Sequence, residues 1–131
     1  MTLAAPALQA VKIRPATFAD FEAILRLIEA CNLADYDSPM VSAEHLRHSW
    51  RSSRLSLALD TWTAFDSQGS LLGYAELEHS DAAQFFPLLY LKHTATTDHP
   101  SMPDFQRIEL GTEFLRRAEK RALSCSTEDA P

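Results

Sequence analysis

The sequence predicts an α+β (α/β layered) fold, in which a mostly antiparallel sheet is flanked by helices. Two segments with apolar residues at helical spacing, residues 17–31 and 105–122, lie towards opposite ends of the chain. Consecutive strand-like segments lie between them, and strands that follow one another directly favour antiparallel pairing. The 131 residues are the size of one domain, and 46% hydrophobic against 23% charged residues allows a buried core.

The N-terminal part is expected to form a short strand followed by a helix. The stretch VKIRPA (11–16) alternates apolar and basic residues and is stopped by Pro15, which is typical of a short strand. Thr17 is a suitable N-cap for the helix over 17–31. Asp20, three residues later, completes a pair that resembles a capping box.

A second helix and further strand-like residues come next. Residues 33–40 are expected to be a loop, after which Ser42 caps a shorter helix over 43–53. The segments RLSLAL (54–59) and DTWTAFD (60–66) are rich in residues that favour strands.

A hairpin and a long strand are expected in the middle of the chain. The turn DSQG (66–69) ends in Gly69 and leads into a strand over 70–80. Strict alternation in that strand predicts two faces. The first holds Leu71, Gly73, Ala75 and Leu77, and the second holds Leu72, Tyr74, Glu76 and Glu78. A further strand over 83–97 contains Pro87, which predicts an edge position or a bulge.

These elements define a domain over 11–122, preceded by a flexible leader (1–10) and followed by a disordered tail (123–131). The last helix, over 105–122, is expected to pack on the sheet. Six side chains are expected in the core: Leu25, Ile28, Leu72, Leu89, Phe114 and Leu115.

Composition excludes several classes of function. The net charge of −6 gives no broad basic face, which argues against a nucleic-acid partner. No apolar run approaches the length of a membrane span. The two cysteines, Cys31 and Cys125, and the histidines lack metal-site spacing, so no metal is expected. A reducing cytoplasm is the default compartment for such a chain.

Five stretches in this order resemble the GNAT superfamily of N-acetyltransferases. IRPATFADFEAILRLI (13–28) is similar to the family's first strand and helix, and LIEACNLADYDSP (27–39) to the first domain of tandem GNAT proteins. DTWTAFDSQGSLLGYAEL (60–77) resembles the second and third strands. DHP (98–100) resembles the end of the fourth strand, and QRIELGTEFLRRAEKRA (106–122) the signature and its helix. The resemblance implies acetyl transfer from acetyl-CoA to a small-molecule or peptide amine.

The resemblance also implies a cofactor-binding segment that contains Gln106, Arg107, Glu109, Gly111 and Thr112. In the family, backbone N–H groups of this signature bind the pyrophosphate of acetyl-CoA. Gln106 and Gly111 match signature positions, whereas Glu109 stands where the first glycine belongs and brings a negative charge. We therefore expect weak or absent acetyl-CoA binding, which Glu109→Gly should improve if the loop geometry survives.

Two further departures bear on the cofactor site. Asp104 is a plausible N-cap, and a helix that starts there would bond the signature N–H groups to its own carbonyls. The family also continues past this helix with C-terminal strands that are missing here, one of which forms a wall of the cofactor slot. The resemblance therefore implies a truncated or decayed domain, or one half of an assembly completed by another chain.

Three residues are candidate general bases. In GNAT enzymes a carboxylate on the central strands often deprotonates the amine, a role that Glu76 or Glu78 could fill. A histidine with an unperturbed pKa titrates in the physiological range, so His93 is the third candidate. The alternative for the carboxylates is a strand face that is simply solvated, or one that is covered by a helix with the carboxylates at its rim. Three functions stay open: an N-acetyltransferase, a catalytically silent GNAT-like module that binds a partner, and a small-ligand-binding domain.

The segment 83–97 also predicts a partner. It is apolar, has few charges, and has no successor strand within the chain. An open, apolar strand edge is a template for pairing with another chain. We therefore expect a homodimer through 83–97.

Overall fold

The computed structural model describes residues 11–36, 43–51, 55–79, 85–92 and 104–128. It confirms the α+β layered fold with an antiparallel sheet between helices. The elements in chain order are β1 (Lys12–Arg14), η2 (Phe18–Asp20), α1 (Phe21–Tyr36), α2 (Ala43–Arg51), α3 (Leu57–Asp60), β2 (Thr61–Phe65), β3 (Leu71–His79), β4 (Phe85–Leu91) and α4 (Asp104–Glu128).

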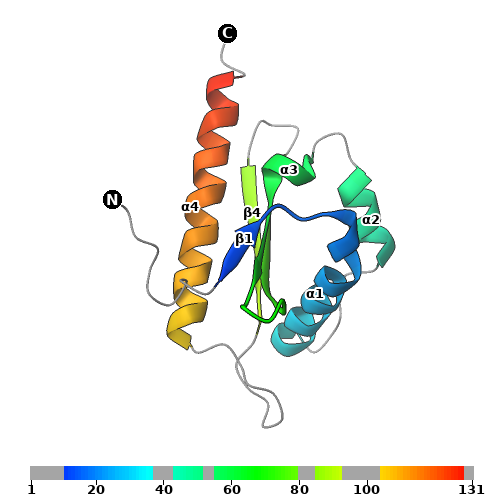
Figure 1. Ribbon diagram of the computed structural model, residues 1–131. Helices are drawn as coiled ribbons and strands as arrows, with labels where there is room; N and C mark the ends of the chain where they lie inside the picture. Colours follow the sequence, from blue (N-terminus) through cyan, green and yellow to red (C-terminus); the bar gives the residue numbers. More distant parts are fainter. Residues whose placement is uncertain (1–10, 37–42, 52–54, 80–84, 93–103, 129–131) are drawn as a thin grey trace.

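The four strands pair in chain order, β1-β2-β3-β4, and every pair is antiparallel. Figure 1 shows the sheet nearly edge-on, with the long helix α4 on one face and α1 and α2 on the other. β3 and β2 are therefore interior strands, while β4 lies at an edge. No helix in the described part of the chain is long and apolar enough to cross a membrane.

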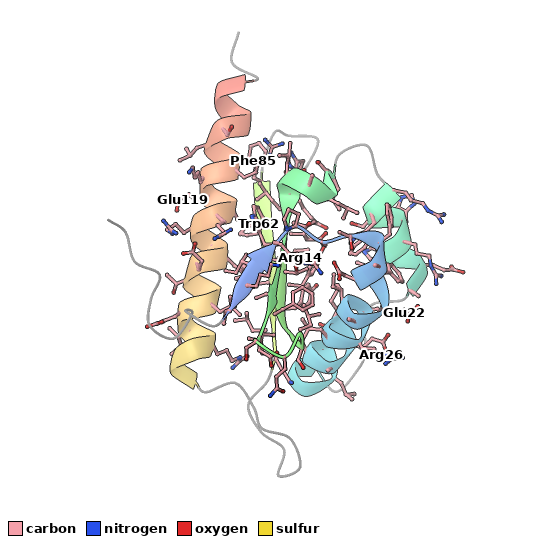
Figure 2. All side chains as sticks on the ribbon, viewed as in Figure 1. Arg14, Glu22, Arg26, Trp62, Phe85 and Glu119 are labelled. Carbon is pink, nitrogen blue, oxygen red and sulfur yellow. The ribbon has the colours of Figure 1, made fainter. Side chains whose placement is uncertain are left out.

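Each face of the sheet has its own apolar core. The core under α4 is built around fully buried side chains, chiefly Trp62, Leu77, Leu110, Phe114 and Ala118. Figure 2 shows Trp62 between the sheet and α4, and Glu119 on the outer side of that helix. The core under α1 and α2 contains Ile24, Leu25, Ile28, Leu46, Trp50 and Tyr74.

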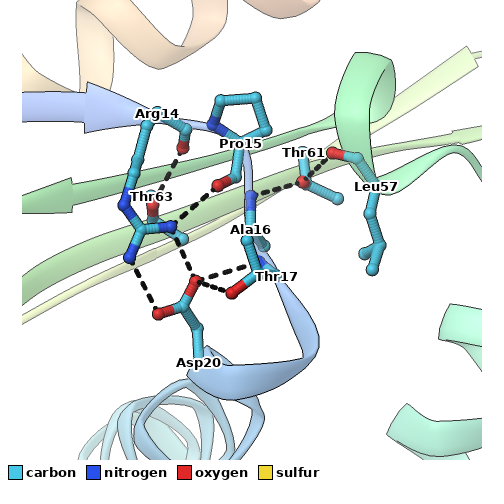
Figure 3. Close-up of polar contacts among 8 residues, drawn as sticks. All are labelled: Arg14, Pro15, Ala16, Thr17, Asp20, Leu57, Thr61 and Thr63. Carbon is cyan, nitrogen blue, oxygen red and sulfur yellow. Dashed lines mark hydrogen bonds and ion pairs between the residues drawn. The ribbon is translucent and has the colours of Figure 1, made fainter.

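The junction from β1 to α1 is fixed by Asp20, as the capping pair predicts. Its carboxylate accepts hydrogen bonds from the Thr17 N–H and hydroxyl, at 2.9 and 3.1 Å. It also forms a two-point ion pair with the Arg14 guanidinium at 2.8 and 2.9 Å (Figure 3). Thr61 and Thr63 of β2 bind the backbone of the same segment. The hydrogen bond from Arg14 is the main cause that lowers the pKa of Asp20.

Asp20→Asn is expected to lower the free energy of unfolding by about 1–2 kcal/mol at pH 7, because the amide cannot accept the Arg14 fork. Urea unfolding measures the loss. The contribution of Asp20 is present above its unfolded pKa and is lost as the pH falls, so wild type and variant should converge in acid. Equal stability of both proteins at pH 7 would contradict the assignment.

The predicted alternation is wrong at the start of β3, because a β-bulge interrupts the strand there. Ala64 pairs with Gly73 but Phe65 pairs with Leu71, so Leu72 is an extra residue in β3. A bulge shifts the side chains on one side of it to opposite faces. Leu72 therefore packs in the core under α4 and Leu71 beside the core under α1, the reverse of the prediction, while the faces of residues 73–77 agree with it.

Two segments are helical where the sequence predicted otherwise. α1 continues to Tyr36, through the first part of the expected loop 33–40, because the first strong helix breaker after its start is Pro39. Leu57–Asp60 forms the single turn α3, although its composition favours a strand. Asp60 closes that turn by accepting a hydrogen bond from the Ser56 N–H at 2.9 Å.

Of the six residues expected in the core, the prediction is wrong for Leu115. It is 47% exposed, because the buried stripe of α4 runs through Leu110, Phe114 and Ala118, and the next residue lies about 100° around the helix. Leu89 is partly buried against the core under α4, and the other four are buried. α4 also continues through Glu128, well into the expected tail 123–131.

Candidate functional site

Glu76 is a buried carboxyl group on the interior strand β3. Its side chain is 4% exposed, and its strand neighbours are Thr61 on β2 and Leu88 on β4. Burial, with a smaller contribution from the nearby Glu78 charge, raises the pKa of Glu76 to about 7, although the hydrogen bond from Tyr74 opposes this shift. A carboxyl with this pKa exchanges a proton near neutral pH, as a general base must.

A hydrogen-bond chain from α2 holds this carboxyl. The Trp50 indole Nε1 donates to the Tyr74 hydroxyl at 3.2 Å, and that hydroxyl donates to Glu76 Oε2 at 3.1 Å. Burial raises the pKa of Tyr74 well above its ordinary value, so the hydroxyl stays a donor. Tyr90 of β4 stacks on Tyr74 with 6.4 Å between ring centroids. The ring stack and the two hydrogen bonds fix the position of Oε2.

The predicted bases Glu76 and Glu78 differ in their exposure to solvent. Glu76 is held in the interior as described. Glu78 is exposed on the same strand and faces solvent, which agrees with the alternative of a solvated face. His93 lies outside the described residues.

An open pocket of about 280 Å³ lies beside this chain of hydrogen bonds. Its lining combines three aromatic rings with three charged groups: Phe18, Phe21, Trp50, Glu22, Arg47 and Arg51. Trp50 packs edge-on against both phenylalanines, and the Arg47 guanidinium lies 5.1 Å from the Phe21 ring centroid. Figure 2 shows Glu22 on the outer side of α1. The indole of Trp50 thus connects the pocket to Tyr74 and Glu76.

The signature segment forms part of a continuous helix. α4 begins at Asp104, so residues 108–112 lie beyond its first turn and their N–H groups bond within the helix. The Thr112 hydroxyl likewise donates to the Ile108 carbonyl at 2.9 Å. A Cβ at Gly111 would lie 3.3 Å from Leu91 Cδ1, so this glycine allows α4 to approach β4. Residues 108–112 therefore do not have the open backbone that a pyrophosphate needs.

The charged side chains of the signature do not provide a pyrophosphate site in place of the backbone. Glu109 Oε2 and Arg107 Nε are both buried atoms without a hydrogen-bond partner. The side chain of Gln106 lies outside the described part of the structure. A partly buried carboxylate here repels phosphate, as the sequence indicated. The described residues of the signature therefore do not fit the pyrophosphate of acetyl-CoA.

One buried ionic cluster was not predicted from the sequence. Asp60 of α3, 2% exposed, accepts a hydrogen bond from Arg121 Nε of α4 at 2.9 Å. His79 Nε2 at the end of β3 is 3.3 Å from the same Asp60 oxygen. The cluster joins three elements distant in sequence, so no local spacing could have found it. No group of three or more metal-binding side chains occurs among the residues that the structure describes.

Solved structures of GNAT acetyltransferases match the fold of this chain. A GCN5-related N-acetyltransferase from Sphaerobacter thermophilus matches with a TM-score of 0.71 and 27% identity, over 94% of this chain and 35% of its own. A GNAT-family acetyltransferase from Staphylococcus aureus matches with a TM-score of 0.64 and 11% identity, over 89% and 69%. A GCN5-related N-acetyltransferase from Kribbella flavida matches with a TM-score of 0.57 and 18% identity, over 87% and 66%.

The antiparallel four-stranded sheet with flanking helices matches the GNAT fold. The structural matches assign the chain to the GNAT superfamily of N-acetyltransferases. No family model matches the sequence, and no curated protein is similar to it. The chain spans only 35% of the S. thermophilus protein, so that protein's activity as a whole does not transfer directly.

Proposed function

We propose that this chain is an N-acetyltransferase-type module, cytoplasmic, whose role is to bind an amine and remove a proton from it for acetyl transfer. The observation that carries the proposal is Glu76, a buried carboxyl on an interior strand with a pKa of about 7. Protonated amines lose a proton before they attack a thioester. Glu76 accepts that proton directly or through a water molecule, and Tyr74 keeps Oε2 in place by its hydrogen bond.

The pocket next to Trp50 supports a class of amine. Neither Arg47 nor Arg51 has an ion-pair partner among the described residues, and both line the pocket with three aromatic rings. Such a lining suits a molecule with an apolar body and an anionic group. We include in the proposal an acceptor whose carboxylate or phosphate lies at these arginines.

A second candidate function has its own observation. Because the signature lies inside α4, the chain can be a catalytically silent GNAT-like module that binds a partner. In that case Glu76 is a structural carboxyl, and the fold serves only as a scaffold. The two candidates differ in whether the chain binds an amine and removes a proton from it.

Calorimetric titration with acetyl-CoA tests whether the signature segment binds the donor, and titration with an amine that carries an anionic group separates the two candidates. We expect binding weaker than about 100 µM, because residues 108–112 are helical and Glu109 is acidic. Glu109→Gly is no longer expected to restore binding, because position 109 lies inside a helix, where glycine costs about 1 kcal/mol. The control Glu109→Gln removes the charge but keeps the helix. Micromolar binding by the wild-type chain would contradict the proposed misfit and favour the enzyme.

A further inference from the structure

The backbone hydrogen-bonding groups of β4 point alternately towards β3 and away from it, and one hydrogen bond shows which residues point which way. The Lys92 N–H, one residue beyond the strand, donates to the Leu72 carbonyl of β3 at 2.8 Å. Antiparallel pairing alternates from residue to residue, so even-numbered residues of β4 bond to β3 and odd-numbered residues point their N–H and C=O groups outwards. The outward row consists of Phe85, Pro87, Leu89 and Leu91.

Two positions in this outward row differ from an ordinary strand edge. Pro87 has no N–H, so the row lacks one donor. The Leu91 carbonyl already accepts a hydrogen bond from the Cys31 thiol of α1 at 3.2 Å, so the row also has one occupied acceptor. Among the described residues no other group binds this outer side of β4. The missing donor and the occupied acceptor lie four residues apart.

We infer that a second copy of the chain pairs with β4 in antiparallel orientation, with Leu89 opposite the partner subunit's Leu89. In this register the two Leu89 residues exchange both of their hydrogen bonds. Pro87 then lies opposite the partner's Leu91, whose N–H donates to the Pro87 carbonyl. The donor that Pro87 lacks is not needed, because the partner's Cys31 already occupies the partner's Leu91 carbonyl. A two-fold axis repeats the same match on the other side.

Neighbouring registers lack this complementarity. A shift that places Pro87 opposite the partner's Pro87 leaves two carbonyls at the centre of the interface without donors. A shift that places Leu89 opposite the partner's Pro87 leaves the Leu89 carbonyl without a donor. A shift that places Leu89 opposite the partner's Leu91 directs the Leu89 N–H to a carbonyl oxygen that already accepts a hydrogen bond from the partner's Cys31. Buried unpaired groups of this kind are costly, so they select the Leu89 register.

The side chains of β4 also favour a second copy of the chain as the partner at this strand edge. The segment Phe85–Leu91 (FFPLLYL) has no charged residue, although charges usually protect a free strand edge. Leu88, Leu89, Tyr90 and Leu91 are each only partly buried, so pairing with a second copy covers apolar surface on both chains. The paired sheets would form one continuous sheet. This inference does not depend on Glu76 or on acetyl transfer.

Sedimentation velocity of the 131-residue chain between about 1 and 100 µM tests the dimer, a range in which interfaces of modest size dissociate. We expect a monomer–dimer equilibrium, with amide exchange at Leu89 and Leu91 slowing as the dimer forms. A monomer throughout this range, with these amides either freely exchanging or already slow, would overturn the inference. A dimer in which these two amides exchange freely would overturn it too, because another face would then be the interface.

Two variants test the register. Leu89→Pro removes an outward donor without removing a bond to β3, and we expect it to abolish the dimer. Cys31→Ala leaves β4 itself unchanged but strips the Leu91 carbonyl of its donor, so the dimer should weaken by about 5- to 100-fold. Circular dichroism checks that each variant folds. If Leu89→Pro does not fold, Cys31→Ala decides: an unchanged dimer constant would overturn the Leu89 register.

Discussion

Phe114→Ala is expected to lower the free energy of unfolding by about 3–5 kcal/mol, among the largest losses for a single side chain in this fold. Phe114 is fully buried at the centre of the core between α4 and the sheet. Its ring fills the space above Gly73, where a Cβ would lie only 2.9 Å from Phe114 Cε2. Removing the ring leaves a cavity between a rigid helix and an interior strand, which cannot close around it.

The adjacent residue provides a matched control. Leu115 lies on the same helix and is 47% exposed, so Leu115→Ala is expected to cost less than about 1 kcal/mol. Urea unfolding of wild type and both variants gives the comparison. Similar losses for Phe114→Ala and Leu115→Ala would show that α4 does not face the sheet as described. A large loss for Phe114→Ala alone confirms the packing and the rotation of α4.

Phe114 also illustrates what the sequence could predict. Helical periodicity identified α1 and α4, strand alternation and the turn at Gly69 identified β2 and β3, and Pro87 indicated an edge strand. Each of these signals is local, because a helix face or a turn is encoded within a few residues. Periodicity fixes the existence of an apolar face more reliably than its width, which explains the misplacement of Leu115.

The errors share a different origin, since each depends on contacts between distant segments. The bulge at Leu72 shifts the register between β3 and its neighbour β2, and no residue type in the sequence predicts it. The helical turn α3 is held by Asp60, whose ion pair with Arg121 spans 61 residues. Gly111 belongs to a recognisable signature, yet a Cβ at its position would lie only 3.3 Å from Leu91 Cδ1 on another element. Sequence spacing alone could not distinguish that packing role from phosphate binding.

The candidate site was predicted in part. Strand alternation places Tyr74 and Glu76 on one face, and the fold confirms that they share the face under α1 and α2. The burial of Glu76 and its separation from the exposed Glu78 depend on how distant segments pack on the sheet. The contribution of Trp50 to the hydrogen-bond chain depends on the same packing. Neither could be inferred before the helices were in place.

Glu76→Gln is expected to stabilise the fold at pH 8 by up to about 3 kcal/mol, which is the shift from 4.5 to about 7 in the pKa of Glu76 converted to free energy. Below about pH 4.5 the carboxyl is protonated in both folded and unfolded chains. Between 4.5 and 7 the unfolded chain loses that proton while the folded chain keeps it, so the stability of wild type falls as the pH rises. The variant has no such group, and the two curves should separate across this window.

Urea unfolding at pH 5, 6, 7 and 8 measures the separation, with Glu119→Gln on the exposed side of α4 as the control. That control should follow wild type at every pH, because Glu119 is solvated. Parallel curves for wild type and Glu76→Gln would contradict the buried, raised-pKa carboxyl. If the chain acetylates an amine, the same variant should lower kcat about 10²- to 10⁴-fold, as expected for loss of a general base. A more stable variant with full activity would leave Glu76 as a purely structural carboxyl and move the base elsewhere.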